Sequence, residues 1–288
     1  MANLKEIRSR ISSVGSTMQI TSAMKMVSAA KLKRAQDAIT QMRPYANKLS
    51  ELLVNLSSTL DSSDGGVYSE KREIKRVLLV TITSNRGLCG GFNTNIIKEA
   101  NSLIKEKYKN IDVDVVSIGK KSTEYFDKTE ECNVISSHDD LYSNLTFEKT
   151  SEIAQNIMDL FTNTNHDKVV LIYNQFKNAA TQIIMNEQFL PIEPPKLKEK
   201  TIGDYIFEPN QKEIVDSLIP KSLKTQLFKA VLDSHASEHG ARMTAMHKAT
   251  DNAGELKKDL TLEYNKARQA AITGEILEIV GGAEALSG

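Results

Sequence analysis

Apolar residues near the N-terminus recur every three and four positions, with charged and hydroxyl side chains between them. The first such set is Leu4, Ile7, Ile11, Val14 and Met18. A second register follows at Ala38, Met42, Tyr45, Leu49, Leu52 and Leu56. This spacing is typical of one face of an α-helix. It predicts a single helix over about residues 3–58, about 80 Å long at 1.5 Å per residue.

The C-terminal part of the chain has the same periodicity. From Pro220 to about Leu286 good helix formers dominate, and we expect Pro220 to lie in the first turn of the helix, where its missing N–H is not needed. Small or apolar residues recur there at Ala249, Ala253, Leu256, Leu260, Ala267, Ala270, Gly274 and Leu277. Such a seven-residue stripe is typical of a helix that packs on a partner helix. The two ends of the chain are therefore expected to pair as a long antiparallel coiled coil.

The middle of the chain changes period. Apolar β-branched runs at 76–83, 113–118, 169–173 and 181–190 predict strands, with a weaker one near 132–135 and a possible edge strand at 205–207. Amphipathic helices are expected at 92–109, 122–126 and 147–161 between them. This alternation predicts a Rossmann-like α/β domain with a mostly parallel sheet, whose last strand is antiparallel. The expected segments are a coiled-coil helix over 1–60, a linker over 61–74, the α/β domain over 75–210 and the second coiled-coil helix over 211–288.

Composition narrows the functional classes. The chain has 37 basic and 37 acidic residues, so a dedicated nucleic-acid surface is not expected. No apolar run approaches the ~18 residues of a spanning helix, and the N-terminus lacks an apolar signal core. Cys89 and Cys132 have neither metal-site nor CxxC spacing, which favours a reducing compartment.

Two motifs could indicate chemistry, and both have simpler interpretations. The glycine-rich turn from Ser84 to Asn93 sits where a phosphate loop would, but its glycines at 87, 90 and 91 match neither the dinucleotide nor the Walker pattern. His235 and His239 with an intervening Glu238 follow the HxxEH pattern of inverted zinc proteases. On a continuing helix without a further ligand we expect solvent-facing histidines instead. No catalytic, cofactor-binding or metal residue is assigned.

An apolar run at Ile272, Ile276, Leu277, Ile279 and Val280 lies beyond the part of the helix that the shorter N-terminal helix could cover. An uncovered apolar helix tip is a candidate binding surface.

Three motif groups resemble one family. Ile7-Arg-Ser-Arg-Ile11 and Met18-Gln-Ile-Thr-Ser-Ala-Met-Lys-Met-Val27 resemble the N-terminal helix of the gamma subunits of F-type ATP synthases, and Ser84-Asn-Arg-Gly-Leu-Cys-Gly-Gly-Phe-Asn93 resembles their central turn. The segments 237–246, 249–252 and 264–273 are similar to the C-terminal helix of that family. The resemblance covers the whole chain, with the motifs in family order.

The resemblance implies a non-catalytic rotor shaft that couples ion flow to ATP synthesis. It implies three alpha and three beta subunits around the shaft, an epsilon subunit and a membrane c-ring, with no cofactor and with membrane association only through the complex. The implied location is the cytoplasmic face of a bacterial inner membrane. The implied contacts to the catalytic ring are Arg268, Gln269, Thr273, Met24 and Lys25, and those to the c-ring are Tyr205 and Glu208.

Two other function classes stay open on the sequence. A nucleotide-binding α/β enzyme would use the helices as dimerisation arms and would bind a small molecule unaided. A generic coiled-coil adaptor would self-associate without an ATPase partner.

Overall fold

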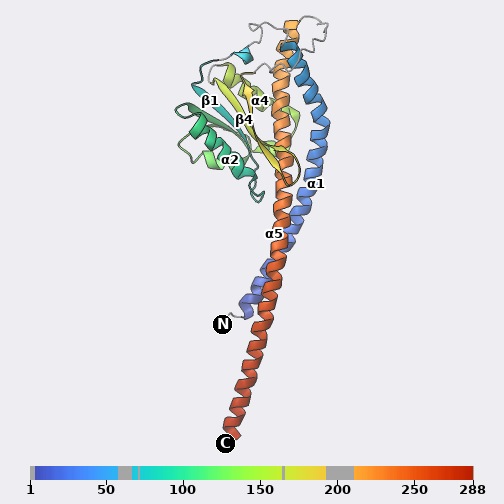
Figure 1. The fold of residues 1–288 in the computed structure, drawn as a ribbon, viewed down its shortest axis with the longest axis vertical. Coiled ribbons are helices and arrows are strands. Elements are labelled where there is room, and N and C mark those ends of the chain that lie inside the picture. The colour runs from blue at the N-terminus through green and yellow to red at the C-terminus, as the bar shows by residue number, and fades with distance from the viewer. Residues whose placement is uncertain (1–3, 58–66, 71, 164–165, 193–210, 288) are drawn as a thin grey trace. The chain divides into compact units, whose positions relative to one another are not determined.

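The computed structural model describes residues 4–57, 67–70, 72–163, 166–192 and 211–287. The chain forms two compact units, one of residues 1–28 with 243–288 and one of residues 29–242. Both long helices run through both units: α1 is Leu4–Ser57 and α5 is Gln211–Ser287 (Figure 1). The two predicted helices are therefore confirmed.

The expectation that Pro220 opens the second helix is wrong, because α5 begins at Gln211 and Pro220 lies inside it. An internal proline removes one backbone hydrogen bond and usually kinks or ends a helix. Here its neighbours Ile219 and Leu223 are buried in the core of the α/β domain. This packing holds the helix through the proline, which local propensity alone does not predict.

The first unit is an antiparallel helix pair. Thr250 Oγ1 donates to Thr21 Oγ1 at 2.8 Å, and the Gly254 position lies beside Met18 Sδ. One turn further along, Gly15 faces the end of the Lys257 side chain. Rising numbers on one helix thus meet falling numbers on the other, which confirms the predicted antiparallel pairing within this unit.

The seam residues of this pair were only partly predicted. The N-terminal set from Leu4 to Met18 is buried or half-buried, and Ala253 and Leu260 are buried on α5. Leu256, however, is 49% exposed, so its assignment to the seam is wrong. Thr250 and Lys257 lie at the seam instead. A hydroxyl that has a hydrogen-bond partner and the long methylene stem of a lysine can both lie along a helix interface.

The second unit contains a five-stranded sheet in the order β3-β2-β1-β4-β5. The strands are β1 Arg76–Ile82, β2 Asp112–Ile118, β3 Asn133–Ser137, β4 Lys168–Phe176 and β5 Gln182–Leu190. All pairs are parallel except β4 with β5. The mixed α/β architecture and the antiparallel last strand are confirmed, whereas the edge strand expected at 205–207 lies outside the described residues.

Helices cover both faces of this sheet. On one face lie α2 (Phe92–Ser102), continued by a π-turn over Leu103–Lys107, and α3 (Lys120–Phe126). On the other lie α4 (Phe147–Thr162) and the first half of α5, with short 3₁₀ turns at Val67–Ser69 and Asp140–Ser143. Leu223, Leu227 and Val231 of α5 share one apolar core with β1, β4 and α4. This half of α5 is thus a layer of the α/β domain; the expected division into four segments stays a prediction.

Within the described ranges, no helix has a stretch both long and apolar enough to span a bilayer.

Candidate functional site

The turn between β1 and α2 occupies the place where doubly wound folds bind ligands. β1 lies between β2 and β4, so the strand order reverses beside it. In open α/β sheets this reversal creates a crevice at the carboxyl ends of the strands. The turn from Ser84 to Gly91 leaves β1 at that end, and its polar contacts decide whether a ligand could bind there.

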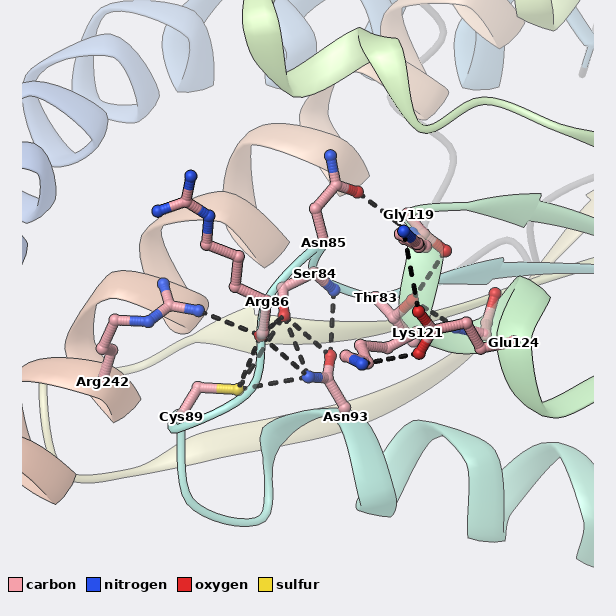
Figure 2. Close-up of polar contacts among 12 residues, drawn as sticks. Thr83, Ser84, Asn85, Arg86, Cys89, Asn93, Gly119, Lys121, Glu124 and Arg242 are labelled. Atoms are coloured by element: carbon pink, nitrogen blue, oxygen red, sulfur yellow. Dashed lines mark hydrogen bonds and ion pairs between the residues drawn. The ribbon is translucent and has the colours of Figure 1, made fainter.

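The turn is closed by bonds to its own residues (Figure 2). Asn93 Oδ1 accepts from the Ser84 backbone N–H at 2.9 Å, and Asn93 Nδ2 donates to Ser84 Oγ at 2.9 Å. Ser84 Oγ in turn donates to Arg86 O at 2.6 Å. Leu88 and Gly90 both have φ near +60°, a conformation that costs glycine little. These contacts give the glycine-rich segment the structure of a tight strand-to-helix turn.

The backbone N–H groups at the start of the neighbouring helix, α3, also have hydrogen-bond acceptors within the chain. The backbone N–H of Lys120 donates to Asn85 Oδ1 at 3.0 Å, and that of Lys121 donates to Ser84 O at 3.1 Å. The Ser122 N–H donates to Thr83 Oγ1 at 3.0 Å. A Cβ at Gly119, where φ is +103°, would lie 2.1 Å from Thr83 O, so only glycine allows this approach. A phosphate would need N–H donors of this kind at a helix N-terminus, and these three already have protein acceptors.

A groove of about 580 Å³ lies outside the turn, between the turn, α2 and α3. Its volume is within the range of small-molecule pockets. Its lining includes Leu88, Asn93, Lys121 and Lys128. Lys121 forms an ion pair with Glu124, and Asn93 closes the turn as described. The groove therefore shows the dimensions of a ligand site but not a set of convergent donors.

On the inner side, the turn is bonded to α5. Arg242 Nη2 donates to Arg86 O at 3.1 Å, as Figure 2 shows. The same nitrogen donates to Gly87 O at 3.4 Å. Arg242 Nη1 pairs with Glu238 one turn back, and both residues are only 8% exposed. Burial is the largest influence on Glu238 and raises the pKa of its carboxyl, while the Arg242 guanidinium opposes that shift.

Two further residues of α5 bond to the backbone of the sheet, and a third lies against the β4–β5 turn. Ser234 Oγ donates to Ile82 O at the end of β1 at 3.4 Å, and Ser237 Oγ donates to Asn174 O in β4 at 3.0 Å. At Gly240 an added Cβ would lie 3.1 Å from Ala179 Cα, so α5 passes very close to the β4–β5 turn. We call Ser234, Ser237, Gly240 and Arg242 together the α5 joint. Sequence reasoning missed it, although Ser-x-x-Ser-x-x-Gly places small residues along one helix face.

The expectation of solvent-facing histidines is wrong. His239 is 5% exposed, its Nε2 lies 3.1 Å from His235 Nε2, and the Tyr142 ring stacks on His235 with centroids 5.7 Å apart. Desolvation lowers the pKa of His235 to about 4 and that of His239 to about 3. The sequence argument treated this part of α5 as coiled coil alone, whereas it is buried within the α/β domain. In the part of the chain with defined coordinates, no cluster of three or more His, Cys, Asp or Glu side chains could hold a metal ion.

The two cysteines are free thiols. Burial raises the pKa of the Cys89 thiol and raises that of Cys132 to about 11. Since the thiolate is the nucleophile, both are poorly suited to nucleophilic catalysis.

The five residues assigned to the catalytic ring lie in the first unit, on two helices. Met24 and Lys25 are half-buried on α1, whereas Arg268, Gln269 and Thr273 are exposed on α5. Thr273 Oγ1 donates to Gln269 O of its own helix at 2.9 Å. Tyr205 and Glu208, assigned to the c-ring, lie outside the described residues. The roles of these residues as partner contacts stay predictions.

The end of α5 has the exposure expected of an uncovered tip. Continuing the antiparallel register to Leu4 brings it opposite roughly residue 267, after which α1 offers no partner. Ile272, Ile276, Leu277, Ile279 and Val280 are all exposed there. Among the described side chains, Arg268 forms no ion pair with Glu263 or Glu275. An intrahelical salt bridge therefore does not explain that arginine.

A family model described as ATP synthase matches residues 3–286. The chain is 64% identical to the ATP synthase gamma chain of Flavobacterium johnsoniae and 62% identical to that of Christiangramia forsetii, in both cases over the full length of both chains. It is 46% identical to the ATP synthase gamma chain of Chlorobaculum tepidum over 99% of each chain.

Solved structures show the same fold. A chain of the Euglena gracilis mitochondrial ATP synthase, solved with OSCP, F1 and c-ring, is similar with a TM-score of 0.72 and 22% identity, over 98% of this chain and 94% of that one. A chain of the Tetrahymena thermophila mitochondrial ATP synthase central stalk and c-ring is similar with a TM-score of 0.61 and 25% identity, over 80% of this chain and 99% of that one. The similarity of the sequence to the family extends over nearly its whole length, and the predicted resemblance is confirmed: this chain belongs to the ATP synthase gamma chain family.

Proposed function

We propose that this chain is the central-stalk rotor subunit of an F-type ATP synthase, coupling proton flow through a membrane c-ring to the conformational cycle of catalytic beta subunits. The observation that carries the proposal is the full-length match to ATP synthase gamma chains, 64% identical in one relative. Similar chains are part of assemblies described as central stalk and c-ring.

The first unit is suited to act as a shaft. It is a helix pair whose far end is a single helix with small exposed residues at Ala270 and Ala271. Small side chains reduce interdigitation with a surrounding sleeve, and interdigitation would oppose rotation. One helix pair cannot contact three identical beta subunits in the same way. It therefore biases the conformation of each differently, to the extent that it binds those conformations unequally.

The proposed contacts to the catalytic ring are Arg268, Gln269 and Thr273 on α5 and Met24 and Lys25 on α1. All five lie in the shaft unit, and the three on α5 present their side chains to solvent. The exposed tip beyond them needs a partner, which a ring of alpha and beta subunits, three of each, would supply. Tyr205 and Glu208 are proposed to contact the c-ring.

We assign the catalysis to partner subunits. The backbone amides at the start of α3 already have acceptors within the chain, so they do not form a phosphate cradle, and burial raises the pKa of Cys89, which disfavours a thiolate nucleophile at this turn. The same domain would hold the epsilon subunit. The proposed location of the chain is the cytoplasmic face of a bacterial inner membrane, where it would be a peripheral protein held by the complex.

The test is reconstitution. Vesicles containing the complex assembled with this chain should synthesise ATP from an imposed proton gradient. Complex assembled without it should hydrolyse ATP without pumping protons. Coupled synthesis in the absence of the chain would refute the proposal.

The α/β-enzyme alternative makes a different prediction, because the purified chain alone would then bind nucleotide saturably. Equilibrium dialysis of the full chain with ATP and ADP distinguishes the two. We expect no saturable binding.

A further inference from the structure

The chain passes between its two compact units only twice, at 28/29 on α1 and at 242/243 on α5. Both crossings are made by continuous helices. If the chain is a rotor, torque applied to the α/β domain leaves that unit along these two helices. The contacts that hold α5 just before it leaves the unit therefore determine whether the helix turns with the domain or rolls within it.

The α5 joint occupies these last turns of α5 within the unit. Its hydrogen bonds reach backbone carbonyls, which are fixed by the sheet and the turn: Ser234 to Ile82 O, Ser237 to Asn174 O, and Arg242 to Arg86 O and Gly87 O. A backbone carbonyl has no rotamer to change, so it cannot reorient to keep its hydrogen bond when the helix turns about its own axis. By contrast, the apolar residues earlier in α5, such as Leu223 and Leu227, make contacts without directional preference.

The joint also holds α5 from two sides. At 100° per residue, Gly240 and Arg242 leave the helix axis about 200° apart. Gly240 lies against the β4–β5 turn at Ala179, whereas Arg242 reaches the β1–α2 turn. The helix is thus held between two turns at the carboxyl edge of the sheet, in the crevice where related folds bind nucleotides.

The segments whose carbonyls accept bonds from the α5 joint are held in place by further hydrogen bonds. Asn174, whose carbonyl receives the Ser237 bond, donates from Nδ2 to Phe92 O at the start of α2 at 3.2 Å. Asn93, the next residue of α2, closes the β1–α2 turn through Ser84. β4, the first residues of α2 and the β1–α2 turn are therefore linked by hydrogen bonds beside α5.

We propose that the α5 joint is the contact that transmits torque between the α/β domain and the shaft half of α5, with Ser237 and Arg242 as positioning residues that prevent the helix from rolling. This inference rests on the proposed rotor function. It assigns to the crevice of the fold a mechanical role in place of a ligand.

The test uses the assembled complex in vesicles, carrying Ser237→Ala, Arg242→Lys or both. Each substitution removes directional hydrogen bonds while keeping helix propensity and, at 242, the positive charge. Losing one such bond raises the population of slipped arrangements about fivefold, and losing the bonds at both positions raises it about 25-fold. We therefore expect protons pumped per ATP hydrolysed to fall in the double variant, and to fall further than in either single variant. ATP hydrolysis itself should persist. Matched controls are Ser217→Ala on an exposed part of α5 and Arg34→Lys on an exposed part of α1, which should keep the wild-type ratio.

A second readout separates torque transmission from simple destabilisation. With the catalytic ring immobilised and inhibited, a bead on the α/β domain should show a broader angular distribution in the double variant than in wild type. An assembly defect lowers the yield of complex but changes neither the ratio nor the angular width.

An unchanged ratio and an unchanged angular width would overturn the inference while leaving the rotor function intact. If the double variant does not assemble, Ser237→Ala alone decides by the same two measurements. Failure of the wild-type complex to couple pumping to hydrolysis would instead refute the proposed function.

Discussion

Replacing Arg242 with Met should reveal how strongly the buried Glu238 depends on its partner. Both residues are 8% exposed, and the Arg242 guanidinium also donates to the carbonyls of Arg86 and Gly87. Removing one member of a buried ion pair leaves an uncompensated charge and costs about 3–5 kcal/mol. We expect a loss of this size in the free energy of unfolding at neutral pH, measured by urea denaturation of the full chain. Arg34→Met, at an exposed position, should change it by less than about 0.5 kcal/mol.

The second substitution identifies the cause. Adding Glu238→Gln removes the buried charge, so the double variant should lose only about 1–3 kcal/mol, the cost of the unsatisfied carbonyls and amide. A double variant no more stable than Arg242→Met would refute the reasoning, as would a loss below about 1 kcal/mol in the single variant.

The pH dependence gives an independent check. Burial already raises the pKa of the Glu238 carboxyl, and without Arg242 the pKa rises further. The folded chain then binds this proton more tightly than the unfolded chain does, so lowering the pH favours the folded state. The deficit of Arg242→Met should therefore be smaller at pH ~5.5 than at pH ~8. A deficit that grows on acidification would contradict this.

Three further predictions concern other parts of the molecule. Arg268→Ala should lower protons pumped per ATP hydrolysed more than Lys25→Ala does, and equal ratios would contradict this ranking. Burial lowers the pKa of His235 to about 4 and that of His239 to about 3, so the folded chain binds fewer protons than the unfolded chain and loses stability as the pH falls below ~6.5. Replacing both histidines with Gln should reduce this dependence of the free energy of unfolding on pH in denaturation measurements. An unchanged dependence would show that other groups cause it. Leu227→Ala, at a fully buried core position, should lower the free energy of unfolding by about 2–5 kcal/mol, whereas a loss below about 1 kcal/mol would indicate that the core closes around the gap.

Much of the fold could be read from periodicity. The stripe from Leu4 to Met18 recurs at the helical period and is the seam of the first unit, while the run from Arg76 to Ile82 is a buried central strand. These segments have one periodic face, or are apolar throughout, so local pattern and tertiary environment agree. Leu256 shows the limit of this approach. Its spacing fits the seam, but a spacing of three and four residues is compatible with more than one helix register. In the structure, Thr250 and Lys257 lie at the seam instead.

The α5 joint could not be predicted from local pattern. His239 reads as a coiled-coil surface residue when α5 is taken as half of a helix pair, yet in the structure the same turns are covered by the α/β domain. Ser237 and Gly240 have low intrinsic helix propensity, and the reason for their presence is the close approach of β4 and of the β4–β5 turn, far away in sequence. The Arg242 bonds likewise join positions more than 150 residues apart.

The most direct test of the rotor account is to isolate the tagged chain from detergent-solubilised membranes and to assay ATP hydrolysis. The account predicts that the chain co-purifies with a large complex that hydrolyses ATP, while the chain separated from that complex neither binds nor hydrolyses nucleotide. A chain isolated alone, or one that hydrolyses ATP unaided, would contradict the account and make the crevice between Thr83 and Asn93 the candidate site of an enzyme.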